Sequence, residues 1–384
     1  MSSVNRWLAV PVAILVVLLI VESAVLPTEA QSLSAVETTL ESLRGLCLED
    51  FFEQSFRALM LRDPEGISYF GLADYYGVRN DRLTDISIAY TEKTMDLEAG
   101  IFEILKSYDR DALPERLRTC YDVYAWHLDA KVRDHPYKYH DYPLNGFLDF
   151  NVPGAIEFVF TTIHTLHDRD DVEDFLARLA QVPLKLDQLI EGIHHRAELG
   201  ILTPKYILTS ARRKIDSILG VAGGVIRDPT HIPVTRSPAY AAFASGLAKI
   251  DSLTQSEKDA YLERAETQFV EDYILAFWEV HELIDELLLT APVEGGATTF
   301  PDGEGFFANE LYRLTSTDLT PDNVHQLGLR EVERIVGEMR DQFAAMGYPR
   351  DASLGRLWDL SSPEEDTYYN GQHGGGSCGA AWLS

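Results

Sequence analysis

Apolar residues recur at steps of three and four along most of the chain after Gln31, and no segment shows convincing alternation of apolar and polar residues. Steps of three and four place side chains on one face of an α-helix, whereas a β-strand needs a period of two. The clearest example covers residues 254–287, with apolar positions at Leu262, Ala265, Phe269, Tyr273, Phe277, Val280, Ile284 and Leu287. The pattern predicts an all-α fold of many helices.

Capping signals mark where several of these helices should begin. A side chain that can cap a helix is followed either by proline at the first helical position or by glutamate three residues later. The signals are Asp63-Pro64-Glu65, Thr320-Pro321-Asp322, and the capping-box pair Thr254 and Glu257. We expect the helix after Thr320 to run to about Met346 and to stop at Gly347.

Proline and glycine predict the main interruptions. The apolar pattern of residues 172–193 is helical, but Pro183 removes a backbone donor in its middle and should kink it or split it into two helices. Residues 136–154 and 227–238 are rich in proline, glycine and polar residues, and we interpret them as long connections within one domain.

Composition excludes some partners and leaves others open. With 46% hydrophobic residues the chain can bury a large core, so disorder is not expected. The 61 acidic and 33 basic residues give a formal net charge of -28, which would repel phosphate backbones and anionic lipid headgroups. Nucleic acid is therefore not expected as a partner.

The first thirty residues have the pattern of an export signal. Arg6 precedes an apolar run over residues 7–21, and Thr28-Glu29-Ala30 offers a cleavage point before Gln31. The run is shorter than the roughly twenty residues that span a bilayer, so cleavage is favoured over an anchor. We expect residues 1–30 to be a signal peptide or N-terminal membrane anchor. The remainder is then periplasmic or secreted, and it contacts the membrane only through residues 1–26 if the segment stays uncleaved.

The C-terminal end changes character after about Asn370. Leu354, Leu357, Trp358 and Leu360 have helical spacing, but residues 371–384 are rich in glycine and show no apolar period. We expect a helical domain over residues 31–370 and a disordered tail over residues 371–384. Such a tail also raises the possibility of a shifted reading frame or a premature stop.

Several histidines and acids have spacings that could serve a metal, although no HExxH motif is present. His281 and Asp285 share a helix face but offer only two ligands. Two further groups, His194 and His195 with Glu198, and His164 with His167, would each need another ligand, so surface or capping roles are favoured. Asp168-Arg169-Asp170-Asp171 does not match the spacing of a calcium loop. We therefore assign no metal ligand and no catalytic residue, and the binding residues remain unknown.

Nucleophile and phosphate motifs are not found either. There is no Gly-x-Ser-x-Gly turn, and Cys378 lies in the glycine-rich tail. The glycines of residues 220–224 lack the lysine of a phosphate loop and more simply end a helix. Cys47 and Cys120 lie in helical segments and could pair in an oxidising compartment, but the sequence does not give their separation.

Several segments resemble the bacterial family known as domain of unknown function 885 (DUF885), and together they cover residues 51–369. One is the run from Ala180 to Ile190, AQVPLKLDQLI, and another is Gly200-Ile201-Leu202-Thr203-Pro204. A third, FPDGEGFF, begins at Phe300. The most recognisable run, TSTDLTPDNVHQLGL, begins at Thr315.

The resemblance implies a zinc peptidase of the helical, angiotensin-converting-enzyme-like kind. In that family the zinc site is supplied by a later region in which His-Glu is followed by Gly-His-His, on a helix facing a deep cleft. That motif does not occur in these residues. The resemblance therefore implies no cofactor for this chain alone, although zinc is expected for full-length members. It also makes peptides candidate partners.

Two hypotheses follow. The first is a truncated DUF885-like exported protein that forms the non-catalytic helical lobe of a zinc peptidase and is inactive alone. The alternative is a non-enzymatic cell-envelope helical protein that binds peptides or a partner. A chain that stops midway through its fold should also expose apolar surface and associate.

Overall fold

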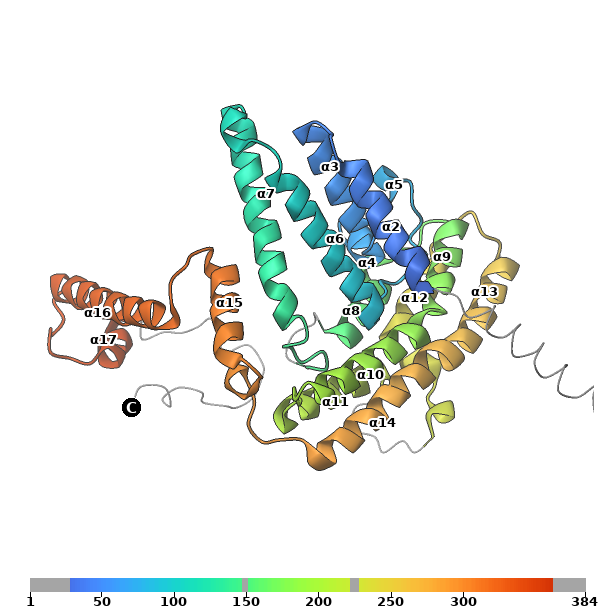
Figure 1. Cartoon of the computed structure of the whole chain (residues 1–384). Helices are drawn as coiled ribbons and strands as arrows, with labels where there is room; N and C mark the ends of the chain where they lie inside the picture. The colour runs from blue at the N-terminus through green and yellow to red at the C-terminus, as the bar shows by residue number, and fades with distance from the viewer. Residues whose placement is uncertain (1–27, 147–150, 222–227, 362–384) are drawn as a thin grey trace, which may run out of the picture. The chain divides into compact units, whose positions relative to one another are not determined.

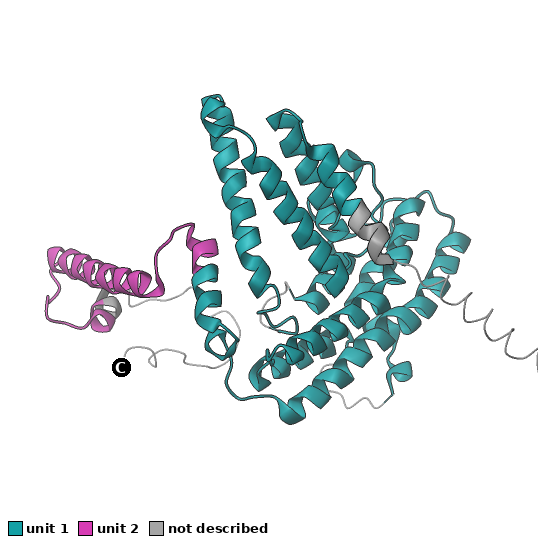
Figure 2. Cartoon of the chain, viewed as in Figure 1, with its two compact units in different colours: residues 1–310 teal, residues 311–384 magenta. Residues whose placement is uncertain are grey.

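The structure is a computed structural model that describes residues 28–146, 151–221 and 228–361. Every regular element in these residues is helical, which confirms the predicted all-α fold. The chain divides into two compact units, residues 1–310 and residues 311–384, coloured separately in Figure 2. No change of composition in the sequence marks this division, so we describe each unit by itself.

The first part of unit 1 is a layer of helices around its own apolar core. The helices are α2 (Thr28–Leu43), α3 (Leu48–Met60), α6 (Ile88–Lys106) and α7 (Glu115–Asp134), and Figure 1 shows them side by side in blue to teal. Their core includes Leu43, Phe51, Ile101, Leu105 and Leu128, each almost fully buried. Burial of one such side chain contributes about 1.5–3 kcal/mol.

Two short helices and an extended segment follow α3. They are α4 (Pro64–Tyr69) and α5 (Ala73–Tyr76), and residues 77–87 then lead to α6. Asp63 caps α4 as predicted, because its Oδ1 accepts a hydrogen bond from the Gly66 amide at 3.0 Å.

The second part of unit 1 holds the larger core. Its helices are α8 (Val152–Phe158), α9 (Arg169–Leu179), α10 (Val182–Glu198), α11 (Lys205–Ile218), α12 (Pro238–Ala248), α13 (Gln255–Gln268) and α14 (Leu275–Thr290). Two π-helical turns, η3 (Val159–Ile163) and η6 (Phe269–Ile274), continue α8 and join α13 to α14. The aromatic centre consists of Phe160, Phe175, Phe243, Phe269, Tyr273 and Phe277.

The predicted long helix after Thr254 is present as α13, η6 and α14 in succession. Thr254 and Glu257 form the capping box, with the Glu257 amide donating to Thr254 Oγ1 at 3.3 Å and the Thr254 amide donating to Glu257 Oε2 at 2.8 Å. The η6 turn was not predicted, because the run of apolar residues continues through a π-turn as it would through an α-helix.

Pro183 splits the helical pattern into two helices, one of the two predicted outcomes. The chain leaves α9 after Leu179, and Pro183 lies in the first turn of α10, where a helix lacks the hydrogen bond that proline cannot make. The predicted connection over residues 136–154 was too long at its end. Asn151 caps α8 by accepting from the Gly154 amide at 2.9 Å, so Pro153 and Gly154 are helical.

The remaining elements are shorter or lie near the C-terminal end. The 3-10 turns among the described residues are η1 (Arg110–Ala112), η2 (His135–Tyr137), η4 (Pro229–His231), η5 (Val234–Arg236) and η7 (Ala297–Thr299). Helix α15 (Gly303–Thr315) crosses from unit 1 into unit 2, which then contains α16 (Pro321–Ala345) and α17 (Leu354–Ser361). As predicted, Thr320 caps α16, and Gly347, with a φ of 91°, follows its end.

The predicted signal segment lies largely outside the described residues, and the predicted tail lies wholly outside them. Helix α2 begins at Thr28 and therefore runs through the predicted boundary between residues 30 and 31. Within the described residues, no helix combines the length and apolarity that crossing a membrane requires.

Candidate functional site

His281 and Asp285 belong to an ion-paired cluster between α11 and α14. Arg212 on α11 pairs with Asp216 and donates from Nε to Asp285 Oδ1 at 2.9 Å. His281 is buried against the Trp278 ring, with centroids 4.3 Å apart. Burial, and then the nearby Arg212, lower the pKa of His281. The Arg212 guanidinium already pairs with both carboxylates, so these residues do not fit a zinc ion.

His164 and His167 also have other uses. Arg178 Nη1 donates to His164 Nδ1 at 3.0 Å, so His164 Nε2 carries the proton and donates to the carbonyl oxygen of Asp171 at 2.9 Å. Burial, and then Arg178, lower the pKa of His164 to about 4. Both ring nitrogens are engaged and are not free to bind a metal. His167 is exposed and lies 3.1 Å from Asp171 Oδ2.

The other predicted groups are dispersed as well. His195 packs edge-on against Tyr139, with its Nδ1 3.9 Å from Glu198, while His194 is exposed. Asp168 caps α9 through the amides of Asp170 and Asp171, which explains the acidic run.

The cysteines and the search for metal ligands add no candidate site. Cys47 and Cys120 are free and exposed, and Cys378 lies outside the described residues. Across residues 28–146, 151–221 and 228–361, no three His, Cys, Asp or Glu side chains gather as a metal would require.

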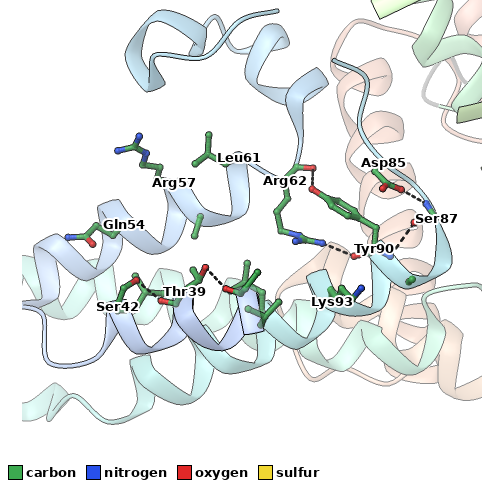
Figure 3. A pocket seen from close by; sticks show the side chains of 16 residues that line it. Thr39, Ser42, Gln54, Arg57, Leu61, Arg62, Asp85, Ser87, Tyr90 and Lys93 are labelled. Carbon is green, nitrogen blue, oxygen red and sulfur yellow. Dashed lines mark hydrogen bonds between the residues drawn. The ribbon is translucent and has the colours of Figure 1, made fainter. Parts of the chain in front are cut away.

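A groove of about 830 Å³ lies between α2, α3 and α6 (Figure 3). Such a volume is in the range of pockets that hold small ligands. Apolar side chains form much of its wall, including the buried Val36, Leu43 and Leu97 and the more exposed Leu61. Thr39 and Ser42 also line it, but each donates to a backbone carbonyl of its own helix, at 2.9 and 2.7 Å.

Arg62 and Tyr90 form a rigid part of the groove wall. The Arg62 guanidinium stacks on the Tyr90 ring, 3.8 Å from its centroid, and donates to Thr94 Oγ1 and to the Tyr90 carbonyl, each at 2.8 Å. In return the Tyr90 hydroxyl donates to the Arg62 carbonyl at 3.0 Å. These contacts hold α3 against α6 and use two of the five N–H groups of Arg62.

Arg57 and Lys93 are different, because neither has a carboxylate partner among the described residues. Arg57 on α3 lies 5.8 Å from the centroid of Tyr76, and Lys93 extends from α6 (Figure 3). The residues that line the groove include these two cations, Arg62 and one acid, Asp85. The Asp85 Oδ1 accepts a hydrogen bond from the Ser87 amide at 2.9 Å. In a chain with a net charge of -28, such a groove favours a ligand that carries negative charge.

This groove could not be predicted from the sequence. Its residues come from three helices separated by loops, and helical periodicity shows which face of a helix is apolar but not which helices meet. Arg57 and Lys93 follow ordinary charge patterns of amphipathic helices. Whether a cation forms an ion pair becomes visible only in three dimensions.

The run from Ala180 to Ile190, in contrast, has a structural task that its pattern did not reveal. Gln181 donates to the carbonyl of Asp81 at 2.7 Å and accepts from the Leu83 amide at 3.1 Å. Gln188 accepts from the Ile86 amide at 3.0 Å. The polar residues of this run therefore fix the segment that leads into α6, one wall of the groove.

The fold and these segments define a helical protein of a known bacterial family. The sequence model of the family described as "Bacterial protein of unknown function (DUF885)" matches residues 64–377. This match covers most of the chain, which therefore belongs to the DUF885 family, as its resemblance implied.

A solved structure shares the fold. It is a crystal structure from Colwellia psychrerythraea described as a "putative lipoprotein", with a TM-score of 0.67 and 18% sequence identity. The similarity covers 87% of this chain and 56% of the Colwellia chain, so this chain spans little more than half the length of that protein. Among curated proteins, none matches the sequence.

Proposed function

We propose that this chain is an exported, peptide-binding helical protein of the DUF885 family. The single observation that carries the proposal is the groove between α2, α3 and α6, with its apolar wall and the cations Arg57 and Lys93. The apolar wall suits the side chains of a short peptide, and Lys93 can hold a free carboxylate of that peptide, with Arg57 adding to the positive charge of the groove.

The proposed location is the cell envelope. The apolar run over residues 7–21 has the pattern of an export signal, and the Colwellia protein with the same fold is described as a "putative lipoprotein". The negative charge of the chain disfavours nucleic acid as a ligand.

We further propose that these residues form the non-catalytic helical lobe of a zinc-peptidase-like fold and do not cleave peptides on their own. The arrangement of Arg212, Asp216, His281 and Asp285 supports this part, because a guanidinium occupies the position between the acids. In the family that the chain resembles, zinc ligands are expected from a later region, with His-Glu followed by Gly-His-His.

Binding is tested with a short peptide probe, fluorescein-labelled Ala-Leu-Ala-Leu-Phe with a free C-terminus. Fluorescence anisotropy against the purified chain should show saturable binding. Lys93→Gln should weaken it about tenfold, as expected for a lost charge-assisted contact. Lys106→Gln is the matched control on the same helix, since Lys106 is paired with Glu103 and does not line the groove. Equal affinities of the wild type and Lys93→Gln would argue against the groove.

Catalysis is tested separately. The same peptide is incubated with the chain and added zinc, and the products are analysed by mass spectrometry. The proposal expects the peptide to remain intact. Turnover that is lost on chelation of zinc would overturn the non-catalytic assignment and would leave the binding proposal in place.

A further inference from the structure

Helix α16 carries an apolar stripe with the spacing of a coiled-coil seam. Six apolar residues follow each other at alternating steps of three and four, the a and d positions of a heptad pattern. They are Leu329, Val332, Val336, Met339, Phe343 and Met346, the last at the C-cap, and we call them the α16 stripe. Such regular spacing along one helix is typical of a surface that packs against a second helix.

The two ends of the stripe are open to solvent, and Val336 in its middle is half-buried. Leu329, Val332 and Met346 are 52%, 60% and 65% exposed. Helix α17 packs against α16 and buries its own Leu357, and Met339 and Phe343 are half-buried. A hollow of about 580 Å³ still opens onto Met339, Phe343 and Met346, and its described lining belongs to α16 and its C-cap. An apolar surface of this kind favours association.

Two charges beside the stripe lack an opposite charge among the described residues. They are Glu333 and Arg340, both at e positions. Several other charges of α16 are paired: Arg334 binds Glu331 and Glu338, at 2.8 and 2.7 Å, and Arg350 binds Asp341. The e positions of a coiled coil set the choice and the orientation of the partner.

We propose that the α16 stripe pairs with the same stripe of a second copy in antiparallel orientation. In that arrangement Leu329 faces Met346 of the other copy, Val332 faces Phe343, and Val336 faces Met339, so every layer is apolar. Antiparallel helices also bring e positions together, which places Glu333 of each copy beside Arg340 of the other.

The charges distinguish this arrangement from a parallel pair. In a parallel pair, e positions lie beside g positions, so Glu333 would face Gly328 and Arg340 would face Ile335. Neither contact compensates a charge. In the antiparallel pair, each of the four charges of the two copies lies beside an opposite charge, and no other molecule is needed. A second copy is therefore the occupant that the charge pattern fits.

The alternative occupant is a further helical segment of a longer chain of this fold, because the Colwellia protein extends well beyond the part that resembles this chain. Such an occupant would leave the chain monomeric in solution when it is purified alone. The oligomeric state and its response to charge reversal therefore separate the two occupants.

The test is sedimentation equilibrium of the full chain and of two charge-reversal variants, Glu333→Arg and Arg340→Glu. The wild type should be a dimer. Each variant alone should dimerise at least tenfold more weakly, because like charges meet twice at its interface. An equimolar mixture of the two variants should form a heterodimer of wild-type affinity, because both opposite-charge contacts are then restored.

The control is Arg330→Glu, which reverses a charge on the outward face of α16 and should leave the dimer unchanged. Circular dichroism verifies that each variant keeps its helical content. A monomeric wild type would overturn the proposal and favour the other occupant. The proposal would also be overturned if neither charge reversal weakened the dimer, or if the mixed variants dimerised no more tightly than each variant alone. The interface would then lie elsewhere or be parallel.

Discussion

The Nζ of Lys185 on α10 lies 2.6 Å from Oε1 of Glu65 on α4, and both side chains are largely buried. Lys185 also donates to the carbonyl oxygen of Thr84 at 3.1 Å. These contacts join α10 to α4 and to the segment that leads into α6. The groove therefore depends on an ion pair between residues far apart in the sequence.

Removal of one partner of this pair should be strongly destabilising. Lys185→Met leaves Glu65 as an uncompensated charge in a largely buried position, which costs roughly 3–5 kcal/mol. The double variant Glu65→Leu with Lys185→Met should recover at least half of that loss, because neither charge of this pair then remains buried. Urea unfolding measures both. A single variant as stable as the wild type would show that the pair does not stabilise the fold.

His164 makes the stability depend on pH. Its pKa is about 4 in the folded chain, against an ordinary value of 6.5. As the pH falls below 6.5 the unfolded chain binds a proton that the folded chain does not, so stability is lost down to about pH 4. The loss from this group is at most about 3 kcal/mol.

The measurement is the unfolding free energy at pH 7 and at pH 4.5 for the wild type, His164→Gln and His194→Gln. His164→Gln should lose less stability over this range than the wild type, whatever its stability at pH 7. His194 is exposed, so His194→Gln should follow the wild type. An equal loss of unfolding free energy between pH 7 and pH 4.5 in all three proteins would contradict the buried, neutral state of His164.

Gly220 ends α11 in a conformation that other residues tolerate poorly. Its φ is 67°, and an added Cβ would lie 2.4 Å from the carbonyl oxygen of Arg236. Gly220→Ala should cost at least about 3 kcal/mol, from the left-handed backbone and the clash together. Gly45 has a φ of 73° with open space around it, so Gly45→Ala should cost only about 1–2 kcal/mol. Thermal unfolding that ranks Gly45→Ala as the more damaging variant would contradict this account.

Zinc should not stabilise the chain through His281 and Asp285. Arg212 pairs with both Asp216 and Asp285, and a bound ligand raises the melting temperature only if it binds the folded state. We expect the same melting temperature with and without an excess of zinc sulfate. A rise that disappears in His281→Asn would show that the cluster binds zinc after all.

Much of the fold could be predicted because its signals are local. The caps at Asp63, Thr254 and Thr320 depend on residues within one helical turn, and all three are present. The end of α11 at Gly220 was also predicted, from the glycines that follow the helix. At Pro153 and Gly154 the predicted connection was too long, because the cap from Asn151 begins helix α8 there.

The candidate site could not be predicted in the same way. His164 and His167 have the spacing of ligands, but Arg178, fourteen residues beyond His164, engages the first ring. Arg212 similarly engages Asp285 from a different helix, seventy-three residues away in sequence. Sequence spacing describes one helix at a time, whereas the chemistry of a side chain depends on groups that tertiary packing brings to it.

The most direct test of the central proposal compares the fluorescein-labelled peptide Ala-Leu-Ala-Leu-Phe as a free acid and as a C-terminal amide. The account predicts that the free acid binds the wild-type chain about tenfold more tightly than the amide, and that Arg57→Gln with Lys93→Gln abolishes this difference. The absence of saturable binding by either peptide would contradict the proposed peptide-binding groove.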